Sequence, residues 1–523
     1  MLWCGVEGAK MLLNSVDFSG KPFHFIGIGG IGMSALAYIL AKRHLPVSGS
    51  DIRSSHITQR LQALGVNIFD QQQATNLTFF QPQNTISDCQ ELITPKLRTS
   101  TSVLLTEPYN LIESLITNTP ANLPQVICST AINTGNLEYR AALDLGCPIF
   151  HRSDLLAALI QEYQSIAVAG THGKTTTSSM IGYMLLQAGL DPTIVVGGEV
   201  NAWEGNARLG QSSYLVAEAD ESDGSLVKLS AAIGVVTNIE LDHPDHYGTL
   251  EEVVQTFQIF ADRCQTLIGC IDCQTVRDRL QPAISYSLDP NTNADYTVTD
   301  IEYDADGTIA RVWEKGKLLG VLKLRLLGQH NLSNALAAVA VGRLVGLEFT
   351  AIAEAIASFS GARRRFERRG ETNGILFIDD YAHHPSEIRA TLAAARLQAK
   401  DNVRIVAVFQ PHRYSRTLAF LPEFAQSFTH ADIAVISEIY SAGEPNLGQV
   451  SGEKLAQMIA EHHPQVTFQP TLSAICEYLS QTLRPGDLVL FLGAGNLNQV
   501  IPEVMNSICE FQGNQGEVVS REQ

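Results

Sequence analysis

A glycine-rich loop at residues 170–177, which reads GTHGKTTT, constrains this chain more than any other feature. It follows an apolar stretch, Ile166 to Ala169, and precedes a helical stretch that reaches about Leu190. Glycines let backbone N–H groups turn toward phosphate oxygens, while Lys174 can neutralise terminal phosphates and Thr175 can offer a hydroxyl to Mg²⁺. The spacing is about one residue shorter than in the usual phosphate loop. Its position between a strand and a helix nevertheless predicts a binding site for ATP and Mg²⁺.

Acidic residues follow the next two predicted strands. The first strand, Tyr214 to Ala217, runs into EADESD at residues 218–223, and the second, Ile233 to Thr237, runs into NIELDHPDH at residues 238–246. Carboxylates at the carboxyl ends of strands beside a phosphate loop are typical of a magnesium–nucleotide site. An exposed acidic loop is the plainer alternative. It is less favoured because the acids of the first cluster repel one another unless a cation lies nearby.

A second glycine pattern lies near the start of the chain. An apolar run begins at Phe23, and a helical stretch begins at Met33. Gly27, Gly29 and Gly32 lie between them, and Asp51 follows further on. This arrangement is also the fingerprint of a dinucleotide-binding dehydrogenase. A dehydrogenase, however, has no use for a downstream phosphate loop with clustered acids. A protein that holds a sugar-nucleotide pyrophosphate at a helix N-terminus needs both sites.

The chain of 523 residues is too long for one hydrophobic core, so we expect about three domains. Strands and helices alternate in three segments, which predicts an α/β fold with mostly parallel sheets. We expect a Rossmann-like domain at residues 1–161, a central domain like the phosphate-loop ATPases at 162–363, and a second Rossmann-like domain at 364–523. A polar stretch at about 70–125 is interpreted as an insertion in the first domain.

Composition excludes several classes of protein. The net charge of −18 is spread along the chain, which disfavours nucleic acid as a partner. No apolar run is long enough to cross a membrane and none resembles a signal peptide, so we expect a cytoplasmic protein. The nine cysteines are irregularly spaced and are interpreted as reduced thiols, including the pair Cys270 and Cys273. Oligomeric state stays open, and Met11 is an alternative start.

Six motifs in order resemble those of the Mur ligase family over nearly the whole chain: GTHGKTTT, EADESD, NIELDH, GQHNLSN at residues 328–334, RRRF at 363–366 and DDYAHHP at 379–385. GIGGIGMSA near the start, DDYAHHPSE and FQPHRYSRT at 409–417 are similar to the branch that adds the first amino acid, L-alanine. A related ligase that attaches a whole tripeptide has a similar plan, and a noncatalytic ATP-binding module is a further alternative.

The resemblance implies a reaction with UDP-N-acetylmuramic acid, ATP and L-alanine as substrates. The lactyl carboxylate attacks the γ-phosphate of ATP, and the amine of L-alanine then displaces phosphate from the acyl phosphate. The residues implied as catalytic are Lys174, Glu218, His243 and His383. Two Mg²⁺ ions are implied, with Thr175, Glu218 and His243 as ligands. Asp242 is a rival for His243, because Mg²⁺ prefers oxygen ligands.

Three groups of binding residues are also implied by the resemblance. Those for ATP are Gly170, Thr171, His172, Gly173, Lys174, Thr175, Thr176, Asn331, Arg365 and Asp380. Those for the UDP-sugar are Gly29, Gly30, Ile31, Gly32, Asp51, Ser129, Thr130 and Ala131. Those for the amino acid are Tyr381, His383, Arg413 and Arg416, where arginines can grip a carboxylate with two hydrogen bonds.

The chain departs from the family pattern at two places. Related ligases often have a Gly-His pair after the second strand for the uracil end, but here the chain reads NIFDQQ at residues 67–72. Several branches use a carbamylated lysine downstream of the Asp-His motif to help hold the second magnesium. This chain has no lysine between Lys228 and Lys315, so the metal would have to be held without that carbamate.

Overall fold

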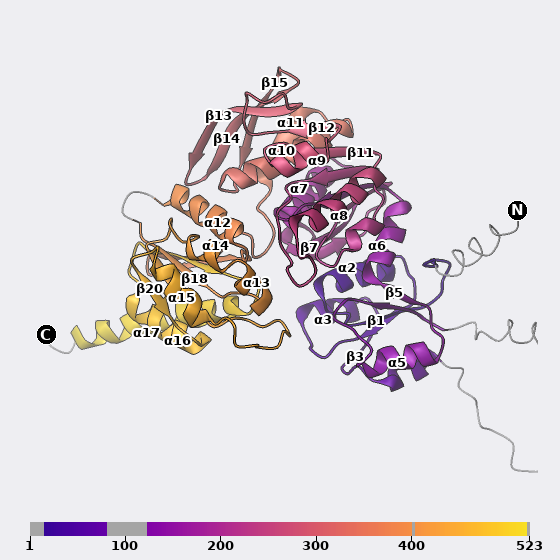
Figure 1. The fold of residues 1–523 in the computed structure, drawn as a ribbon, viewed down its shortest axis with the longest axis horizontal. Coiled ribbons are helices and arrows are strands. Elements are labelled where there is room, and N and C mark those ends of the chain that lie inside the picture. Colours follow the sequence, from indigo (N-terminus) through magenta and orange to yellow (C-terminus); the bar gives the residue numbers. More distant parts are fainter. Residues whose placement is uncertain (1–14, 81–122, 400–402, 520–523) are drawn as a thin grey trace, which may run out of the picture. The chain divides into compact units, whose positions relative to one another are not determined.

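The computed structural model describes residues 15–80, 123–399 and 403–519. Most of the polar stretch, including a possible strand at Ser102 to Leu105, lies outside these ranges, as does the alternative start at Met11. The chain forms two compact units, one up to Ala158 and one from Leu159 onward. Both are α/β, as the alternation of strands and helices predicts (Figure 1).

The first unit contains a five-stranded parallel sheet in the order β3-β2-β1-β4-β5. Its strands are β1 (Phe23–Ile26), β2 (Val47–Ser50), β3 (Asn67–Phe69), β4 (Gln125–Cys128) and β5 (Ile149–His151). Its helices are α2 (Ile31–Lys42), α3 (His56–Gln62), α5 (Leu137–Asp144) and α6 (Arg152–Gln161), with a 3₁₀ helix at Ala74–Phe80. The order of the strands reverses between β1 and β4. Ligands of open parallel sheets bind at such a point, beyond the carboxyl ends of the strands.

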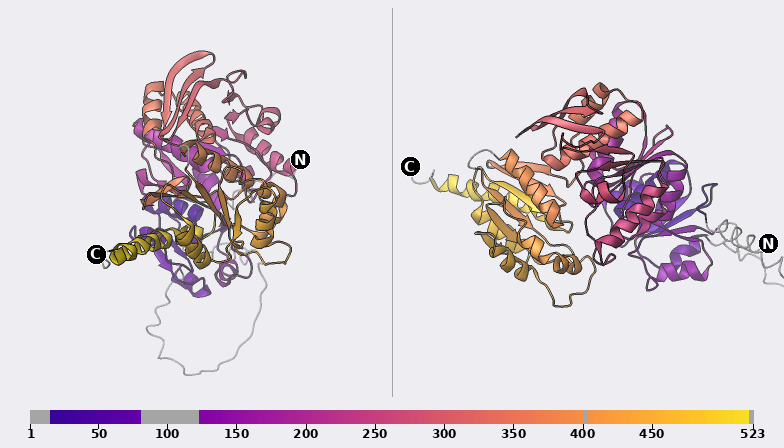
Figure 2. Two further views of the ribbon diagram at one scale, coloured as in Figure 1. Left: turned by 90° about the vertical axis from the view of Figure 1, so that its left-hand side faces the viewer. Right: turned by 45° about the horizontal axis from the view of Figure 1, so that its top comes forward.

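The second unit begins with a ten-stranded sheet in the order β15-β14-β13-β12-β11-β10-β6-β9-β7-β8. Its parallel part contains β6 (Gln164–Ala169), β7 (Thr193–Val200), β9 (Tyr214–Glu218), β10 (Ile233–Val236), β11 (Thr266–Cys270), β12 (Ile284–Tyr286) and β13 (Tyr296–Asp304). The antiparallel strands β14 (Gly307–Glu314) and β15 (Lys317–Leu324) extend β13 into the ribbon visible in both views of Figure 2, and β8 (Gly205–Arg208) pairs antiparallel with β7.

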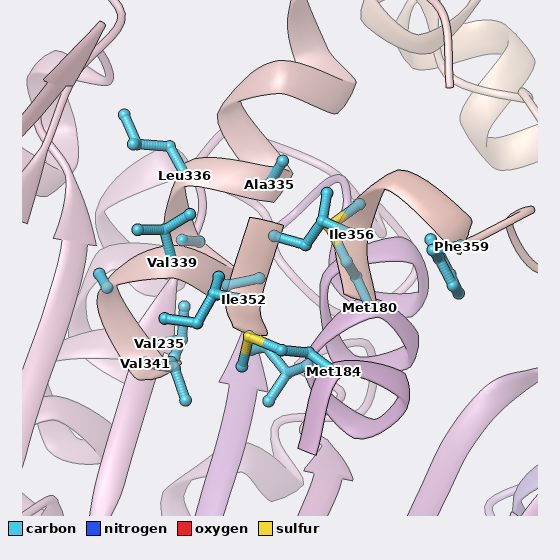
Figure 3. Close-up of a cluster of buried hydrophobic side chains, with 14 of the residues drawn as sticks. Met180, Met184, Val235, Ala335, Leu336, Val339, Val341, Ile352, Ile356 and Phe359 are labelled. Atoms are coloured by element: carbon cyan, nitrogen blue, oxygen red, sulfur yellow. The ribbon is translucent and has the colours of Figure 1, made fainter. Parts of the chain in front are cut away.

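Three helices cover the central sheet and enclose its core. They are α7 (Lys174–Gln187), α10 (Gln329–Leu344) and α11 (Phe349–Ser358). Met180 and Met184 on α7 pack with Val339 on α10 and Ile352 on α11 over Val235 of the sheet (Figure 3). Burial of this apolar surface fixes α7, and therefore the loop that precedes it, against the sheet. Two further helices, α8 (Leu250–Arg263) and α9 (Gln274–Arg279), follow β10 and β11.

The last part of the chain forms a six-stranded sheet in the order β16-β17-β21-β18-β19-β20. Its strands are β16 (Glu367–Thr372), β17 (Ile375–Asp380), β18 (Ile405–Phe409), β19 (Ile433–Ile436), β20 (Val466–Phe468) and β21 (Leu488–Leu492). Only β16 runs antiparallel to its neighbour. The helices are α12 (Pro385–Gln398), α13 (Tyr414–Ala419), α14 (Leu421–Ala425), α15 (Gly452–Ala460), α16 (Leu472–Thr482) and α17 (Val500–Val519).

The structure confirms the expected fold class, an α/β chain with three mostly parallel sheets. The three sheets span residues 23–151, 164–324 and 367–492. No helix within the described ranges combines the length and the apolar character needed to cross a bilayer. The described cysteines, Cys270 and Cys273 among them, are free thiols.

Candidate active site

The phosphate loop joins the end of β6 to the start of α7, as expected. Gly170 has φ 139° and Gly173 has φ 82°, a region of backbone conformation that favours glycine. A Cβ on Gly170 would lie 2.0 Å from the hydroxyl oxygen of Thr237, so a larger residue does not fit. The backbone N–H of His172 donates to the side-chain oxygen of Asn238 at 2.8 Å. The neighbouring strand β10 and the residues after it therefore hold the loop in place.

Lys174 points back over the loop, and only 12% of its side chain is exposed. Its Nζ donates to the backbone oxygens of Gly170 at 2.7 Å and Thr171 at 3.2 Å, and it pairs with Glu221 Oε1 at 2.8 Å. Burial alone would lower the pKa of Lys174, but Glu221 and Asp220 raise it above its usual value. The lysine is therefore a permanent cation. Glu221 is its ion-pair partner.

Glu221 is a site residue that the sequence placed in an acidic cluster without assigning it a role. Its side chain is only 2% exposed. Burial raises the pKa of Glu221 to about 7, although Lys174 acts in the opposite direction. Its second oxygen, Oε2, is buried and has no hydrogen-bond partner among the described residues. The acidic cluster signalled a cation site, but four candidate acids in the same stretch left the partner of Lys174 undecided.

Glu218 and Thr175, two of the expected metal ligands, lie at the same edge of the sheet. Glu218 ends β9, and its Oε2 accepts the backbone N–H of Gly197 at 2.7 Å. A Cβ on Gly197 would lie 2.6 Å from that carboxylate, so glycine makes room for it. Thr175 lies in the first turn of α7, and its hydroxyl is 3.4 Å from the guanidinium of Arg365.

His243, the third expected metal ligand, adopts a left-handed backbone conformation with φ 55°. This turns its ring toward the acidic cluster, with Nε2 3.8 Å from Glu221 Oε1. Its neighbour Asp242 is buried and accepts from Arg416 Nε at 2.8 Å and from the backbone N–H of His243 at 2.6 Å, both at Oδ1. Burial would raise the pKa of Asp242, but Arg416 and His243 hold it well below its usual range. Oδ1 of Asp242 is thus taken up by these donors, while its Oδ2 lies 3.6 Å from Nε2 of His243.

A pocket next to the loop gathers expected ATP residues from both parts of the second unit. His172, Gly173, Thr176, Asn331, Arg365 and Asp380 all line it. It is also lined by residues that the analysis of the sequence did not single out for ATP, namely Asn238, Glu240, His330, Asn334 and Glu387. Polar and apolar residues both line the pocket, which suits a nucleotide, and the phosphate loop forms one side of it.

Two of the expected ATP residues have structural partners of their own. Both carboxylate oxygens of Asp380 accept backbone N–H groups, from Phe366 at 2.7 Å and Ala382 at 2.8 Å. Burial raises the pKa of Asp380 to about 6. The side-chain nitrogen of Asn331 donates to the backbone oxygen of Leu327 at 2.8 Å, and its side-chain oxygen accepts from the side-chain nitrogen of Asn334 at 3.4 Å.

Two of the residues expected to bind the amino acid, Tyr381 and His383, lie on the loop after β17. Arg413 precedes α13, and Arg416 lies on α13. Tyr381 and His383 are in contact, with ring centroids 5.3 Å apart, and His412 lies 5.9 Å from His383. Burial lowers the pKa of His383 to about 4, so its ring is neutral at pH 7. Sequence reasoning did not assign a role to His412, although it lies within FQPHRYSRT.

The two expected arginines pair with carboxylates that follow β10. Arg413, at φ 70°, places Nη1 2.6 Å from Asp245 and 3.5 Å from Glu444. The ion pair of Arg416 and Asp242 is nearly excluded from water, with 3% and 5% of the side chains exposed. The terminal nitrogens of Arg416 also contact Nδ1 of His412 at 3.4 Å and Nδ1 of His243 at 3.3 Å. Guanidinium groups have the paired donors that a small carboxylate needs.

The expected UDP-sugar residues lie in the first unit. Gly29 and Gly30 join β1 to α2, Ile31 and Gly32 begin α2, and Ser129 to Ala131 directly follow β4. Both groups therefore lie at the carboxyl edge where the strand order reverses. The carboxylate of Asp51 accepts the backbone N–H of Gly29 at 2.8 Å, and a Cβ on Gly29 would lie 2.8 Å from it. Asp51 therefore shapes the glycine turn itself.

His172, Glu240 and His384 offer atoms that all lie within 4.8 Å of one another, a set that could hold a metal ion. Burial would lower the pKa of His172, but hydrogen bonds to Glu240 and Glu387 raise it to about 10. The two glutamates therefore favour the protonated form of His172.

Family comparisons agree with these motifs. The description "Mur ligase family, catalytic domain" matches residues 22–164, "Mur ligase middle domain" matches 168–342, and "Mur ligase, glutamate ligase domain" matches 364–495. The chain therefore belongs to the Mur ligase family, which confirms the resemblance drawn from its sequence.

Individual relatives cover nearly the whole chain. A UDP-N-acetylmuramate–L-alanine ligase of Nostoc punctiforme is 72% identical over 499 residues, which are 95% of this chain and 99% of that protein. The same enzyme of Gloeothece citriformis is 63% identical over 497 residues, again 95% of this chain and 99% of that protein.

Solved structures extend the comparison. The crystal structure of a UDP-N-acetylmuramate–alanine ligase from Thermotoga maritima matches with a TM-score of 0.74 and 26% identity, covering 94% of this chain and 99% of that one. A murein peptide ligase from Psychrobacter arcticus matches with a TM-score of 0.64, 22% identity and the same coverage, a likeness of fold alone.

Proposed function

We propose that this enzyme joins L-alanine to UDP-N-acetylmuramic acid and converts ATP into ADP and phosphate. The observation that carries the proposal is the joint arrangement of the phosphate loop, its Lys174 and Arg365, which reaches Thr175 from the last part of the chain. Relatives that are 72% and 63% identical over nearly the full chain carry that enzyme name. ATP and sugar nucleotides are cytoplasmic pools, so we propose the cytoplasm as its place of action.

The roles of the three parts of the chain follow from where their residues lie. We assign the UDP-sugar to residues 1–161, ATP to 162–363 and the amino acid to 364–523. The lactyl carboxylate attacks the γ-phosphorus of ATP, the bond to the β-phosphate oxygen breaks, and ADP leaves. The amine of L-alanine then attacks the acyl carbon. The bond between that carbon and the phosphate oxygen breaks, and inorganic phosphate leaves. Lys174 and Arg365 lie where they can neutralise the charge on the transferring phosphoryl group.

The acids of the second unit fit magnesium. Thr175, Glu218 and His243 would hold the metal, and the buried, unpartnered Oε2 of Glu221 is the kind of oxygen that a divalent cation satisfies. When bound, Mg²⁺ spreads the negative charge of the phosphates. We propose two ions, as the family resemblance implies. His383, neutral at pH 7, can accept a hydrogen bond from the incoming amine.

Phosphate release tests this function directly. The purified protein is mixed with Mg²⁺ and ATP, with and without UDP-N-acetylmuramic acid, and with L-alanine, L-serine, glycine or the tripeptide. We expect phosphate release only when the sugar nucleotide and an amino acid are both present, with L-alanine as the preferred acceptor. A preference for the tripeptide would identify the recycling activity instead. Nucleotide binding without phosphate release would identify a noncatalytic module, and tight binding of nicotinamide cofactors a dehydrogenase.

Bicarbonate should not affect the activity. Carbamylation of a lysine needs dissolved carbon dioxide, and this chain has no lysine between Lys228 and Lys315 to carry the carbamate. We therefore expect equal rates in degassed, bicarbonate-free buffer and after bicarbonate is added at fixed pH and ionic strength. A reproducible activation of several-fold would show that another lysine supplies a carbamate and that the metal site is placed wrongly.

A further inference from the structure

We propose that Glu387 and Glu240 are positioning residues that fix the phosphate loop against the amino-acid loop, defined as residues 381–384. Together with His172 and Ser386 they form what we call the junction clamp. The inference rests on the function proposed above, because it concerns how the ATP site and the amino-acid site are held in register. Glu387, Glu240 and Ser386 are not among the substrate-binding residues expected from the sequence.

Glu387 divides its two carboxylate oxygens between the two sides. Oε2 accepts the backbone N–H groups of His383 at 2.9 Å and His384 at 3.2 Å, which fixes the end of the amino-acid loop at the start of α12. Oε1 lies 3.3 Å from Nδ1 of His172 in the phosphate loop. The carboxylate of Glu387 therefore contacts both loops at once. Its side chain is 14% exposed, so water screens these contacts only weakly.

Glu240 makes the reciprocal connection from the other side. It follows β10, in the part of the chain that carries the phosphate loop, and its Oε2 accepts from the hydroxyl of Ser386 on α12 at 2.7 Å. The same oxygen lies 3.3 Å from Nε2 of His172. His172 is therefore held between one carboxylate from each side. Glu240 is 43% exposed, so we expect its contribution to be smaller than that of Glu387.

The position of the His172 ring supports this arrangement. Its Nδ1 and Nε2 each lie 3.3 Å from one glutamate oxygen, so the ring bridges the two carboxylates. His172, Glu240, Ser386 and Glu387 also line the pocket assigned to ATP. Disruption of the junction clamp should therefore weaken the binding of both ATP and L-alanine.

Two variants and one control test the clamp in the full-length enzyme. Glu387→Gln keeps the size of the side chain but removes its charge, and Ser386→Ala removes one hydroxyl while keeping every carboxylate. Glu453→Gln, an exposed glutamate on α15, is the matched control. The measurements are the Kd for ATP by calorimetry, the KM for each of the three substrates, kcat, and the melting temperature.

For Glu387→Gln we expect the Kd for ATP and the KM values for ATP and L-alanine to rise about ten- to hundredfold, the loss typical of a charged hydrogen bond. Ser386→Ala should raise the same constants by about tenfold or less. The KM for the UDP-sugar, the melting temperature and all constants of Glu453→Gln should stay near those of the parent. This split between substrates is what positioning predicts, since a general loss of folded enzyme lowers kcat without changing any KM.

Two outcomes would overturn the clamp. One is an unchanged Kd for ATP together with an unchanged KM for L-alanine in both variants. The other is a fall in melting temperature and kcat with every KM preserved, which would make Glu387 and Ser386 merely structural. If the parent enzyme releases no phosphate, the proposed function fails, but the clamp is still decided by the Kd for ATP of Glu387→Gln against the parent.

Discussion

Lys174→Ala should abolish ligation while the fold persists. The lysine is the cation of the phosphate loop, and the loss of one such contact to the transferring group costs about 3 kcal/mol or more in the transition state, by analogy with the loss of an oxyanion donor. We therefore expect the rate of phosphate release to fall by more than about a hundredfold. The structure adds a second effect. Glu221 loses its cationic partner at 2.8 Å, so its pKa should rise above about 7 and the carboxyl should be protonated at neutral pH.

The control for this experiment is Lys317→Ala, which removes an exposed lysine of β15 far along the chain from the loop. It should retain the activity of the parent. Circular dichroism and the melting temperature establish that Lys174→Ala is folded. Activity of the folded variant above about a tenth of that of the parent would refute the role of the lysine.

Arg416→Ala should be the most destabilising single change at the site. It leaves Asp242 buried without its guanidinium partner, and breaking one side of a buried ion pair costs about 3–5 kcal/mol. The double variant Arg416→Ala with Asp242→Asn should recover part of this loss, because no charge then remains buried. Urea unfolding of the parent, the two single variants and the double variant gives the coupling free energy. A single variant as stable as the parent would contradict the pairing.

The pH dependence of stability checks the same pair. The folded pKa of Asp242 lies below its unfolded value, so the stabilisation is present above an unfolded pKa of about 3.9 and is lost as pH falls below it. We expect this acid-dependent loss to be smaller when Asp242 is replaced by Asn.

Kinetics separate this structural role from substrate binding. Arg416→Ala and Arg413→Ala should each raise the KM for L-alanine far more than the KM for ATP, because both are proposed to hold the amino-acid carboxylate. Arg413 is about one-third exposed, so its removal should cost less stability than that of Arg416. Equal effects on both substrates would place the arginines elsewhere.

Strand positions could be predicted from the sequence wherever a strand is buried on both faces. Ile405 to Phe409, Ile433 to Ile436 and Leu488 to Leu492 are continuous apolar runs, and each is a strand with those limits in the structure. The ribbon of β13 to β15 was not singled out. Its strands are partly exposed, so apolar and polar residues mix and the apolar signal is weak.

Which residues gather at the site could be predicted in part. Motifs placed His172, Asn331 and Arg365 at one nucleotide site, and the structure brings all three to one pocket. In the sequence, Glu387 stands out only as the last residue of the motif DDYAHHPSE. The signal that could have found it is the capping pattern at the start of α12, in which a glutamate returns to the backbone N–H groups before the helix.

The sequence by itself determined the local features: the phosphate loop, the strands that flank it, and the membership of the Mur ligase family. These depend on residues that are neighbours along the chain, where glycine conformation and apolar periodicity act directly. Only the tertiary structure decided which acid meets Lys174, and that Arg416 pairs with Asp242. The partners in that second pair are 174 positions apart, so packing of whole sheets and helices selects them, and several acids of equal chemical character compete for each cation in the sequence.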